Sequence, residues 1–364
     1  MRMIVALLLI LWPLAALSQT DDRGTLTAFL EDNLSSAGRK VTVTGFSGAL
    51  SSRAAIEQLT IADDAGIWLT LNGVVLDWNR LALLTGAVEV NALTADEVIL
   101  ARPPNPDPNA MPSPESQGFA LPELPVSVRI GQIAVPRMVL GPAVLGQAVE
   151  GSLEASLMLS GGEGEASLAI LRQDAGPDGA VNLTASYANA SRTLLFALDA
   201  QEAEGGIAAT LLGLPGTPQT RLVLEGSGPL SDFAADLRLE TEGRERLAGR
   251  VTLVQTDSGA ARFAVDVGGD VAPLLLPDYA AFFGPDVRLV AEGAQATDGR
   301  LNLSRLDVQS RALDLQGSLE LAPDGLPERF DLTVQLGLPG GGPVLLPLPG
   351  AARTFVEVAD LDLG

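Results

Sequence analysis

The chain has 364 residues, enough for two or more ordinary domains, and it contains neither histidine nor cysteine. It therefore forms no disulfide, has no thiol chemistry and cannot build a Ser-His-Asp or Cys-His catalytic group. A formal net charge of −22 disfavours binding to nucleic acid, where cations must neutralise phosphates, and docking on anionic lipid headgroups.

The N-terminal residues have the pattern of an export signal. Arg2 is a minimal charged region, residues 3–17 are an apolar run, and Ala16-Leu17-Ser18 resembles a cleavage site. The run is short for a membrane span, which needs roughly 17–25 residues. Residues 1–18 are therefore predicted to be a signal peptide or an uncleaved signal anchor, and either interpretation places residues from 19 onward outside the cytoplasm.

A short helix and then several strands are predicted over residues 19–101. Apolar residues at helical spacing predict a helix at residues 25–37. Strands follow from Lys40, and Asn72-Gly73 between two of them predicts a hairpin turn. Residues 80–84 are predicted to form one helical turn.

Residues 102–125 interrupt the strand pattern with eight prolines. Proline fixes φ and removes a backbone donor, so a cluster of prolines is unsuited to a hydrogen-bonded ladder. The stretch is predicted to be an exposed loop or linker, with a docking motif for a partner as the less favoured interpretation.

Apolar and polar residues alternate through residues 126–364, which are predicted to continue an antiparallel sheet. Residues 313–321, for example, read Leu-Asp-Leu-Gln-Gly-Ser-Leu-Glu-Leu. Successive side chains of a strand point to opposite faces, so each strand has one aliphatic face and one polar face. The alternation assigns nine candidate residues to the aliphatic face: Leu237, Leu239, Val265, Leu313, Leu315, Leu319, Leu332, Val334 and Leu336.

A long sheet with an aliphatic face must hide that face. It can close into a barrel, pack as a sandwich, or curl into a trough that holds something apolar. Aromatic residues make up only 4% of the chain, whereas a compact core usually relies on large aromatic anchors. The apolar segment 272–283 is predicted to be a short helix that lies on the sheet or caps its trough.

No catalytic or metal site is predicted. The acidic pairs Asp63-Asp64 and Asp360/Asp362 are explained by solvated turns and outward strand faces. We therefore expect no enzyme activity, no cofactor and no bound metal.

Residues 40–100 carry a family resemblance. The most specific stretch is Val75-Leu76-Asp77-Trp78-Asn79-Arg80-Leu81-Ala82-Leu83-Leu84-Thr85-Gly86, followed by Val88-Glu89-Val90-Asn91-Ala92-Leu93. It resembles the N-terminal region of the TamB proteins of the translocation and assembly module, and more broadly the AsmA-like, bridge-like lipid-transfer family. Trp78, Leu83 and Leu84 are expected to pack over a sheet end, and six motif residues are given structural roles: Asp77, Trp78, Asn79, Leu83, Leu84 and Gly86.

The resemblance implies a mainly β fold. The expected architecture is an elongated, twisted antiparallel sheet that curls into a groove with an aliphatic interior, with short N-terminal and internal helices. The nine residues of the aliphatic face would then line a lipid groove.

The resemblance also implies a role in envelope biogenesis. We expect a periplasmic conduit that carries phospholipid acyl chains between the inner and outer membranes, or that assists outer-membrane protein assembly and secretion. The chain would be anchored in the inner membrane of a Gram-negative bacterium by its N-terminal segment. Family members reach an outer-membrane barrel partner, TamA-like or BamA-like, through a C-terminal region that we expect to be missing here.

Two alternatives to a lipid conduit remain open on the sequence. One is a secreted structural or adhesive β-protein with a dry core. The other is an outer-membrane β-barrel, whose strands also alternate apolar and polar residues. Such a barrel carries girdles of aromatic residues at both membrane–water interfaces. Three tryptophans and two tyrosines are few for such girdles, so the barrel is the less favoured.

The proline-rich stretch generates a first testable prediction. Limited proteolysis should cut within residues 102–125 before any other site, because an exposed loop adapts readily to a protease. A resistant fragment should remain on the C-terminal side, identified by mass spectrometry. First cuts within residues 313–338 would show instead that the prediction of an ordered sheet at these residues is wrong.

Overall fold

The structure is a computed structural model that describes residues 40–48, 51–105, 127–255, 261–296, 298–348 and 353–364. The predicted signal segment, the predicted helix at residues 25–37 and most of the proline-rich stretch lie outside the described residues. Within the described part of the chain, no helix is long and apolar enough to cross a membrane.

The chain is mainly β, as predicted, and divides between Gly176 and Pro177 into two compact units. The boundary predicted at the proline-rich stretch stays a prediction, because most of that stretch lies outside the described residues. The first unit contains a 3-10 helix η2 (Arg80–Thr85), a helix α3 (Pro142–Leu145) and eight described strands: β1 (Lys40–Thr44), β2 (Arg53–Asp63), β3 (Gly66–Asn79), β4 (Ala87–Thr94), β5 (Glu97–Leu100), β6 (Ser127–Leu140), β7 (Val149–Ser160) and β8 (Glu163–Arg172).

Pairing in the first unit is antiparallel except at β6, which runs parallel to both β4 and β5. Leu140 of β6 lies opposite Leu100, and Ser127 lies opposite Ala87. Parallel neighbours need a connection of a dozen residues or more, because the chain must return to the same end of the sheet. The chain between Leu100 and Ser127, which contains the proline-rich stretch, is that connection.

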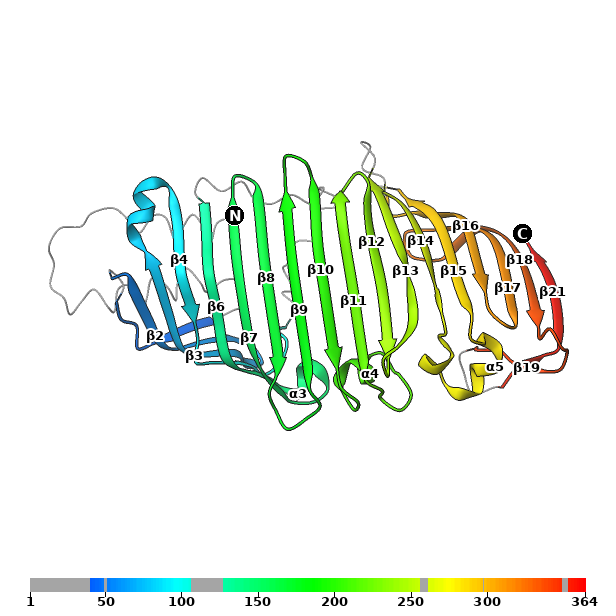
Figure 1. Cartoon of the computed structure of the whole chain (residues 1–364), viewed down its shortest axis with the longest axis horizontal. Helices are drawn as coiled ribbons and strands as arrows, with labels where there is room; N and C mark the ends of the chain where they lie inside the picture. The colour runs from blue at the N-terminus through cyan, green and yellow to red at the C-terminus, as the bar shows by residue number, and fades with distance from the viewer. Residues whose placement is uncertain (1–39, 49–50, 106–126, 256–260, 297, 349–352) are drawn as a thin grey trace. The chain divides into compact units, whose positions relative to one another are not determined.

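The second unit is an antiparallel meander. Strands β9 to β18 each pair with the next along the chain, and β21 pairs with β18 (Figure 1). The strands are β9 (Gly179–Ala188), β10 (Thr193–Glu202), β11 (Thr220–Pro229), β12 (Phe233–Thr241), β13 (Arg244–Gln255), β14 (Ala261–Gly269), β15 (Val287–Gln295), β16 (Leu301–Gln309), β17 (Leu313–Leu321), β18 (Pro327–Gly337) and β21 (Val358–Leu363).

Short helical segments accompany this meander. Helix α4 (Ile207–Leu211) follows β10, and the segment predicted as one helix forms three short turns: η3 (Ala272–Leu274), η4 (Pro277–Tyr279) and α5 (Ala280–Phe283). Pro277 starts a new turn because proline cannot continue a helix from within. Phe282, Ala312 and Val344 form the buried cluster of the second unit, where α5 meets the two-stranded pair β19 (Val344–Leu345) and β20 (Phe355–Val356).

The hairpin predicted at Asn72-Gly73 is wrong. Strand β3 runs straight through these residues and pairs with β2 on one side and β5 on the other. The turn between β2 and β3 lies at Asp64-Ala65 instead. Gly73 keeps a positive φ of 61°, and a Cβ there would lie 2.0 Å from Oδ2 of Asp96, so the glycine marks a close approach rather than a turn.

An ion pair fastens this β2–β3 turn to the residues after β5. Asp63 binds both terminal nitrogens of Arg102 and accepts the backbone N–H of Ala65 and of Asn105, each at 2.9 Å. The Asp63 side chain is 7% exposed, so the expectation of a solvated turn acid is wrong. The hydrogen bond from Arg102, followed by that from the Asn105 N–H, holds the pKa of Asp63 well below its ordinary value.

This pair generates a stability prediction. The Asp63→Asn variant should unfold at a lower temperature than the wild type at pH 7, because it removes the charge that Arg102 neutralises. The folded-state pKa is depressed, so the stabilisation is present above the ordinary carboxyl pKa of about 3.9 and is lost as the pH falls below it. The gap between the two melting temperatures should therefore shrink from pH 5 to pH 2.

Asp298→Asn serves as the control for this prediction. Asp298 pairs with Arg300 at the surface, with half of its side chain exposed, and exposed pairs contribute little. Equal effects of the two substitutions at pH 7 would contradict a special role for the Asp63 pair.

Candidate functional site

The antiparallel register of the second unit places apolar residues opposite apolar residues on every strand. One line crosses eleven strands through Leu183, Leu198, Leu224, Leu237, Gly249, Val267, Leu289, Val308, Leu315, Val334 and Leu361. A second line, two residues along each strand, passes through Ala185, Phe196, Gly226, Ala235, Val251, Val265, Ala291, Leu306, Gly317, Leu332 and Leu363. Neither line contains a polar side chain, and together with their apolar neighbours they are called the aliphatic face below.

All nine predicted lining residues lie on the aliphatic face. Leu237, Leu315 and Val334 belong to the first line, and Val265 and Leu332 to the second. Leu319 lies between Leu303 and Phe330 in a third line. The other three lie beyond the first line, where β12, β17 and β18 continue: Leu239, Leu313 and Leu336. The register thus brings the whole predicted set together, while its role as a lipid groove stays a prediction.

The aliphatic face is only partly covered. Eight of the nine predicted lining residues are partly buried, and Val334, at 9% exposed, is the most enclosed of the nine. A packed core looks different in this same unit, where Phe282, Ala312 and Val344 are 3%, 2% and 2% exposed. Side chains of a dry core are enclosed on all sides, so the aliphatic face is not packed as a core is.

Aromatic rings fill one gap in the face. The rings of Phe196 and Phe233 stack with centroids 5.9 Å apart and an interplanar angle of 23°. They lie over Gly226, where a Cβ would come within 2.5 Å of Phe233 and 2.6 Å of Phe196. A glycine is required there because the rings occupy the space of its missing side chain.

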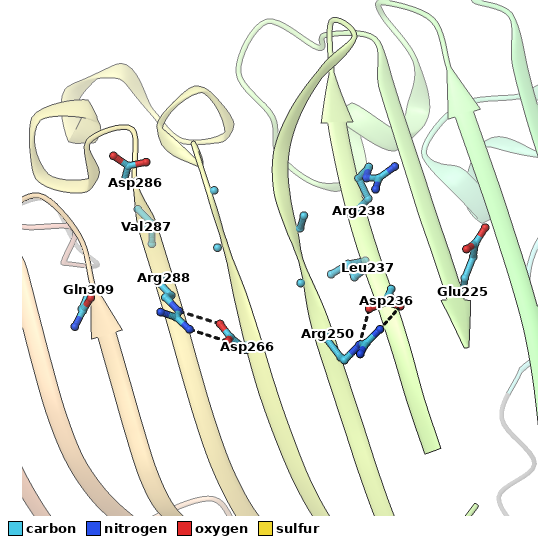
Figure 2. Close-up of a pocket in the computed structure, with 14 residues that line it drawn as sticks. Glu225, Asp236, Leu237, Arg238, Arg250, Asp266, Asp286, Val287, Arg288 and Gln309 are labelled. Atoms are coloured by element: carbon cyan, nitrogen blue, oxygen red, sulfur yellow. Dashed lines mark hydrogen bonds and ion pairs between the residues drawn. The ribbon is translucent and has the colours of Figure 1, made fainter. Parts of the chain in front are cut away.

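The opposite face of the same strands is polar and carries paired charges. Arg250 binds Asp236 through two bonds of 2.8 and 2.9 Å, and Arg288 binds Asp266 at 3.0 and 2.8 Å (Figure 2). These arginine hydrogen bonds lower the pKa of Asp236 and of Asp266. All four side chains are more than half exposed, so the pairs add little stability. They keep this face polar and in contact with water.

An open pocket of about 910 Å³ lies over this part of the sheet. Figure 2 shows that charged side chains from β11 to β15 surround it. Its three arginines are all engaged by carboxylates, since Arg238 pairs with Glu245 at 3.0 Å in addition to the two pairs above. The lining thus has four carboxylates against three arginines, with no cation left over for an anionic ligand.

The first unit repeats the same construction. One line of facing residues runs through Val41, Ile61, Leu69, Leu100, Leu140 and Val149. A second runs through Val43, Leu59, Leu71, Val98 and Met138 to Gly151. Each unit therefore has an apolar face assembled across its strands.

The family-motif residues hold the junction of β3, η2 and β4. Asp77 accepts from Asn91 at 3.0 Å, and Asn79 donates to Glu89 at 3.0 Å. Trp78 donates its ring N–H to the Ser51 carbonyl at 3.1 Å. These contacts agree with structural roles for the three residues.

The motif prediction fails at Leu84. Its side chain is 84% exposed, so the expectation that it packs over a sheet end is wrong. In the 3-10 helix η2 the residue that turns inward is Ala82. Gly86 follows η2 with a φ of 74° and lets the chain turn into β4, whereas the side chain of Leu83 lies outside the described residues.

Sequence reasoning missed a buried arginine. Arg246, 6% exposed, donates to the Thr241 hydroxyl at 2.8 Å and to Asp270 at 3.0 Å. Its segment Glu-Gly-Arg-Glu-Arg has the composition of a solvated turn, so no local signal pointed to burial.

No chemical centre emerges from the described residues. Among them, no group of histidine, cysteine, aspartate or glutamate is arranged to hold a metal ion. Comparison with protein-family models, with curated proteins and with solved structures finds no match. A functional argument therefore rests on the aliphatic face.

Single-cysteine labelling tests whether that face is open. The chain has no cysteine of its own, so one introduced thiol reports on one position. The thiols of Leu315→Cys and Leu332→Cys should react with a maleimide at rates within about tenfold of those of the outward Gln316→Cys and Thr333→Cys. The reaction rate of a thiol with an ordinary pKa depends on how accessible the thiol is. Ala312→Cys in the buried cluster should react roughly 100-fold more slowly, since it must wait for opening.

The contrary result is equally clear. If the thiols at 315 and 332 were as protected as the thiol at 312, the aliphatic face would be covered.

Proposed function

We propose that the chain is an envelope lipid-transfer protein of the TamB and AsmA-like family, and that its aliphatic face holds phospholipid acyl chains between the inner and outer membranes. One observation carries the proposal: two lines of eleven facing residues contain no polar side chain, and most of the predicted lining is only partly buried. Soluble proteins rarely leave a contiguous apolar patch of more than a few hundred Å² in water. A face of this kind calls for an apolar partner.

The dimensions of the face support acyl chains as that partner. Strands lie about 4.8 Å apart, so the ten steps between eleven strands cover roughly 48 Å along the second unit. An acyl chain reaches across about half of a hydrocarbon core that is roughly 30 Å thick, so the face has length for more than one lipid.

The chemistry of the face supports the same partner. Leucine, valine and alanine offer surface without directional contacts, and each methylene moved out of water contributes about 0.8 kcal/mol. A polar headgroup finds no side-chain partner along the two lines and would remain at the margin in water.

The remaining parts of the proposal concern location and cargo. The apolar run at residues 3–17 would anchor the chain in the inner membrane of a Gram-negative bacterium, with the acidic bulk in the periplasm. Assistance to outer-membrane protein assembly or secretion, with a TamA-like or BamA-like barrel as partner, belongs to the same proposal as a second cargo.

A secreted structural or adhesive β-protein with a dry core is the competing function. It requires the aliphatic face to be enclosed. The incomplete burial of Leu315 and Leu332, beside the nearly complete burial of Ala312 in the same unit, supports the lipid proposal over this alternative.

Arginine substitution within the face tests the proposed function. Leu315→Arg and Leu332→Arg should fold and yet block lipid passage, because a long side chain in an open groove can extend its charge to the margin. A photoreactive residue at 315 or 332 should form lipid adducts in cells, whereas one at 316 or 333 should not. Thermal unfolding of each purified variant is measured alongside.

The neighbouring Thr333→Arg provides the matched control, since Thr333 is exposed on the polar face. In a dry core, the inward arginines would bury an unpaired charge and unfold the protein, while Thr333→Arg would be tolerated. Unfolding of both inward variants, with no lipid adduct at any position, would leave only the structural β-protein.

A further inference from the structure

All three buried polar side chains of the described residues lie together, at one end of β11, β12 and β13 (Figure 1). Thr220, Thr241 and Arg246 are 4%, 2% and 6% exposed. Thr220 faces Thr241 across the β11–β12 pair, and Arg246 donates to the Thr241 hydroxyl at 2.8 Å. Burial of a polar group is costly unless the group is hydrogen-bonded, so this cluster needs an explanation beyond ordinary packing.

The cluster borders the aliphatic face and lies on the same side of the sheet. Along β12, Leu237, Leu239 and Thr241 share that side, because alternate residues of a strand point the same way. Leu239 still faces a leucine on each neighbouring strand, Leu222 on β11 and Leu247 on β13. The next residue of β12 on this side is Thr241, so the aliphatic face ends here in polar side chains.

The hairpin between β12 and β13 adds two exposed charges to this border. Thr241 pairs with Arg244, and Glu242 and Gly243 between them have φ of 53° and 69°. Positive φ at both central residues is the geometry of the tight turn that suits a hairpin. The side chain of Glu242 is 69% exposed, and Arg244 is exposed and forms no ion pair with any described residue.

Arg246 is held in place within the border. It is the extra residue of the bulge in the β12–β13 pair, and it donates to Asp270 at 3.0 Å as well as to Thr241. Its Nη2 atom also lies 4.0 Å from the Glu242 carboxylate. These residues, with Glu202 opposite Thr220, are called the polar margin below: Glu202, Thr220, Thr241, Glu242, Arg244, Arg246 and Asp270.

One group in the polar margin has no use within the described part of the chain. The Thr220 hydroxyl is buried and has no hydrogen-bond partner there. Buried hydroxyls of native proteins are nearly always paired. The group is therefore available to an oxygen atom of a ligand.

The opposite border of the aliphatic face has no such character. Phe233 pairs with Leu253, which pairs with Phe263. The line continues through Gly293, Leu303 and Leu319 to Phe330 without a charged side chain: Phe233, Leu253, Phe263, Gly293, Leu303, Leu319 and Phe330. An amphipathic molecule on the aliphatic face thus meets a polar border at one end only.

We propose that the polar margin binds the headgroup of a phospholipid whose acyl chains lie along β12 and β13, an inference that rests on the function proposed above. The free guanidinium of Arg244 suits a phosphodiester, since arginine binds phosphate oxygens through paired hydrogen bonds. The exposed carboxylate of Glu242 suits an ammonium group. The Thr220 hydroxyl is a donor for a further oxygen of the lipid.

The charges of the polar margin favour a zwitterionic headgroup with a primary ammonium group. Two arginines, Arg244 and Arg246, meet three carboxylates, and one of these, Glu202, accepts the Ala208 N–H at 2.6 Å. An anionic headgroup would add to this excess and to the net charge of −22. Phosphoethanolamine instead brings one anion and one cation, which Arg244 and Glu242 match in sign.

The length of β12 suits this placement. Six residues separate Thr241 from Ala235, which is about 20 Å along a strand, and Phe233 lies about 27 Å away. An acyl chain spans about half of a hydrocarbon core, or roughly 15 Å. A lipid with its headgroup at the polar margin therefore keeps its chains on the aliphatic residues and ends them before the aromatic border.

Headgroup competition tests the proposal on the full chain in detergent. Phosphatidylethanolamine and phosphatidylglycerol with identical acyl chains are offered in equal amounts, and bound lipid is counted by native mass spectrometry. We expect phosphatidylethanolamine to be enriched about fivefold or more on the wild type. Arg244→Gln/Glu242→Gln should bring the ratio close to one while total bound lipid changes by less than about twofold, because the aliphatic face is intact.

Two further variants separate recognition from general effects. Arg238→Gln/Glu245→Gln removes an ion pair of 3.0 Å from the polar face of the same hairpin and should leave the ratio unchanged. Thr220→Val keeps the shape of the side chain and should lower the ratio without lowering the unfolding temperature, since the hydroxyl has no partner in the described residues.

Carbodiimide coupling then locates the headgroup. The reagent activates a carboxylate, which the lipid amine attacks to form an amide, and the chain has a single lysine, Lys40, to compete. The lipid adduct should map to Glu242 and be lost in Glu242→Gln.

The outcomes distinguish this proposal from the proposed function. Wild-type protein that binds lipid without headgroup preference, or with adducts spread over the carboxylates of the polar face, would overturn the headgroup site and leave the lipid-transfer proposal standing. Equal loss of preference in both double variants would overturn it too, because charge anywhere on the hairpin would then suffice. Wild-type protein that binds no lipid would overturn both proposals.

Discussion

The strand register of the second unit is the constraint on which the rest of the structure depends. Side chains alternate with a period of two, so a slip of one residue on any strand would move its leucines from the aliphatic face to the polar face. Register shifts interrupt four of the ten pairings from β9 to β21, and the two apolar lines still run unbroken across all eleven strands. The separation of an aliphatic face from a charged face follows from this alone.

A bulge preserves the register where the sequence breaks its own alternation. On β16, Leu303 and Leu306 are three residues apart, which would put them on opposite faces of a regular strand. The register shifts between them, so that Leu303 lies opposite Leu319 and Leu306 opposite Gly317. The extra residue is accommodated where the Ser304 hydroxyl bonds the Glu292 carbonyl at 3.2 Å. Both leucines thereby stay on the aliphatic face.

The sequence predicted the features that depend on local pattern. Alternation was sufficient to assign Leu315 and Leu332 to one face, because strand geometry fixes where each successive side chain points. It could not reveal the parallel pairing of β6, which joins residues far apart in the chain, nor which side chains the turn at Leu84 leaves exposed. Asn72-Gly73 has the composition of a hairpin turn, but strand pairing on both sides of β3 keeps these residues within the strand. The turn prediction was therefore wrong.

The most direct test of the central claim is the lipid content of the protein itself. The full chain, extracted from membranes and examined by native mass spectrometry, should carry phospholipid, and the Leu315→Arg/Leu332→Arg variant should carry much less while unfolding at a similar temperature. Wild-type protein that is folded and as stable as the variant, but carries no lipid, would contradict the claim that the aliphatic face holds acyl chains.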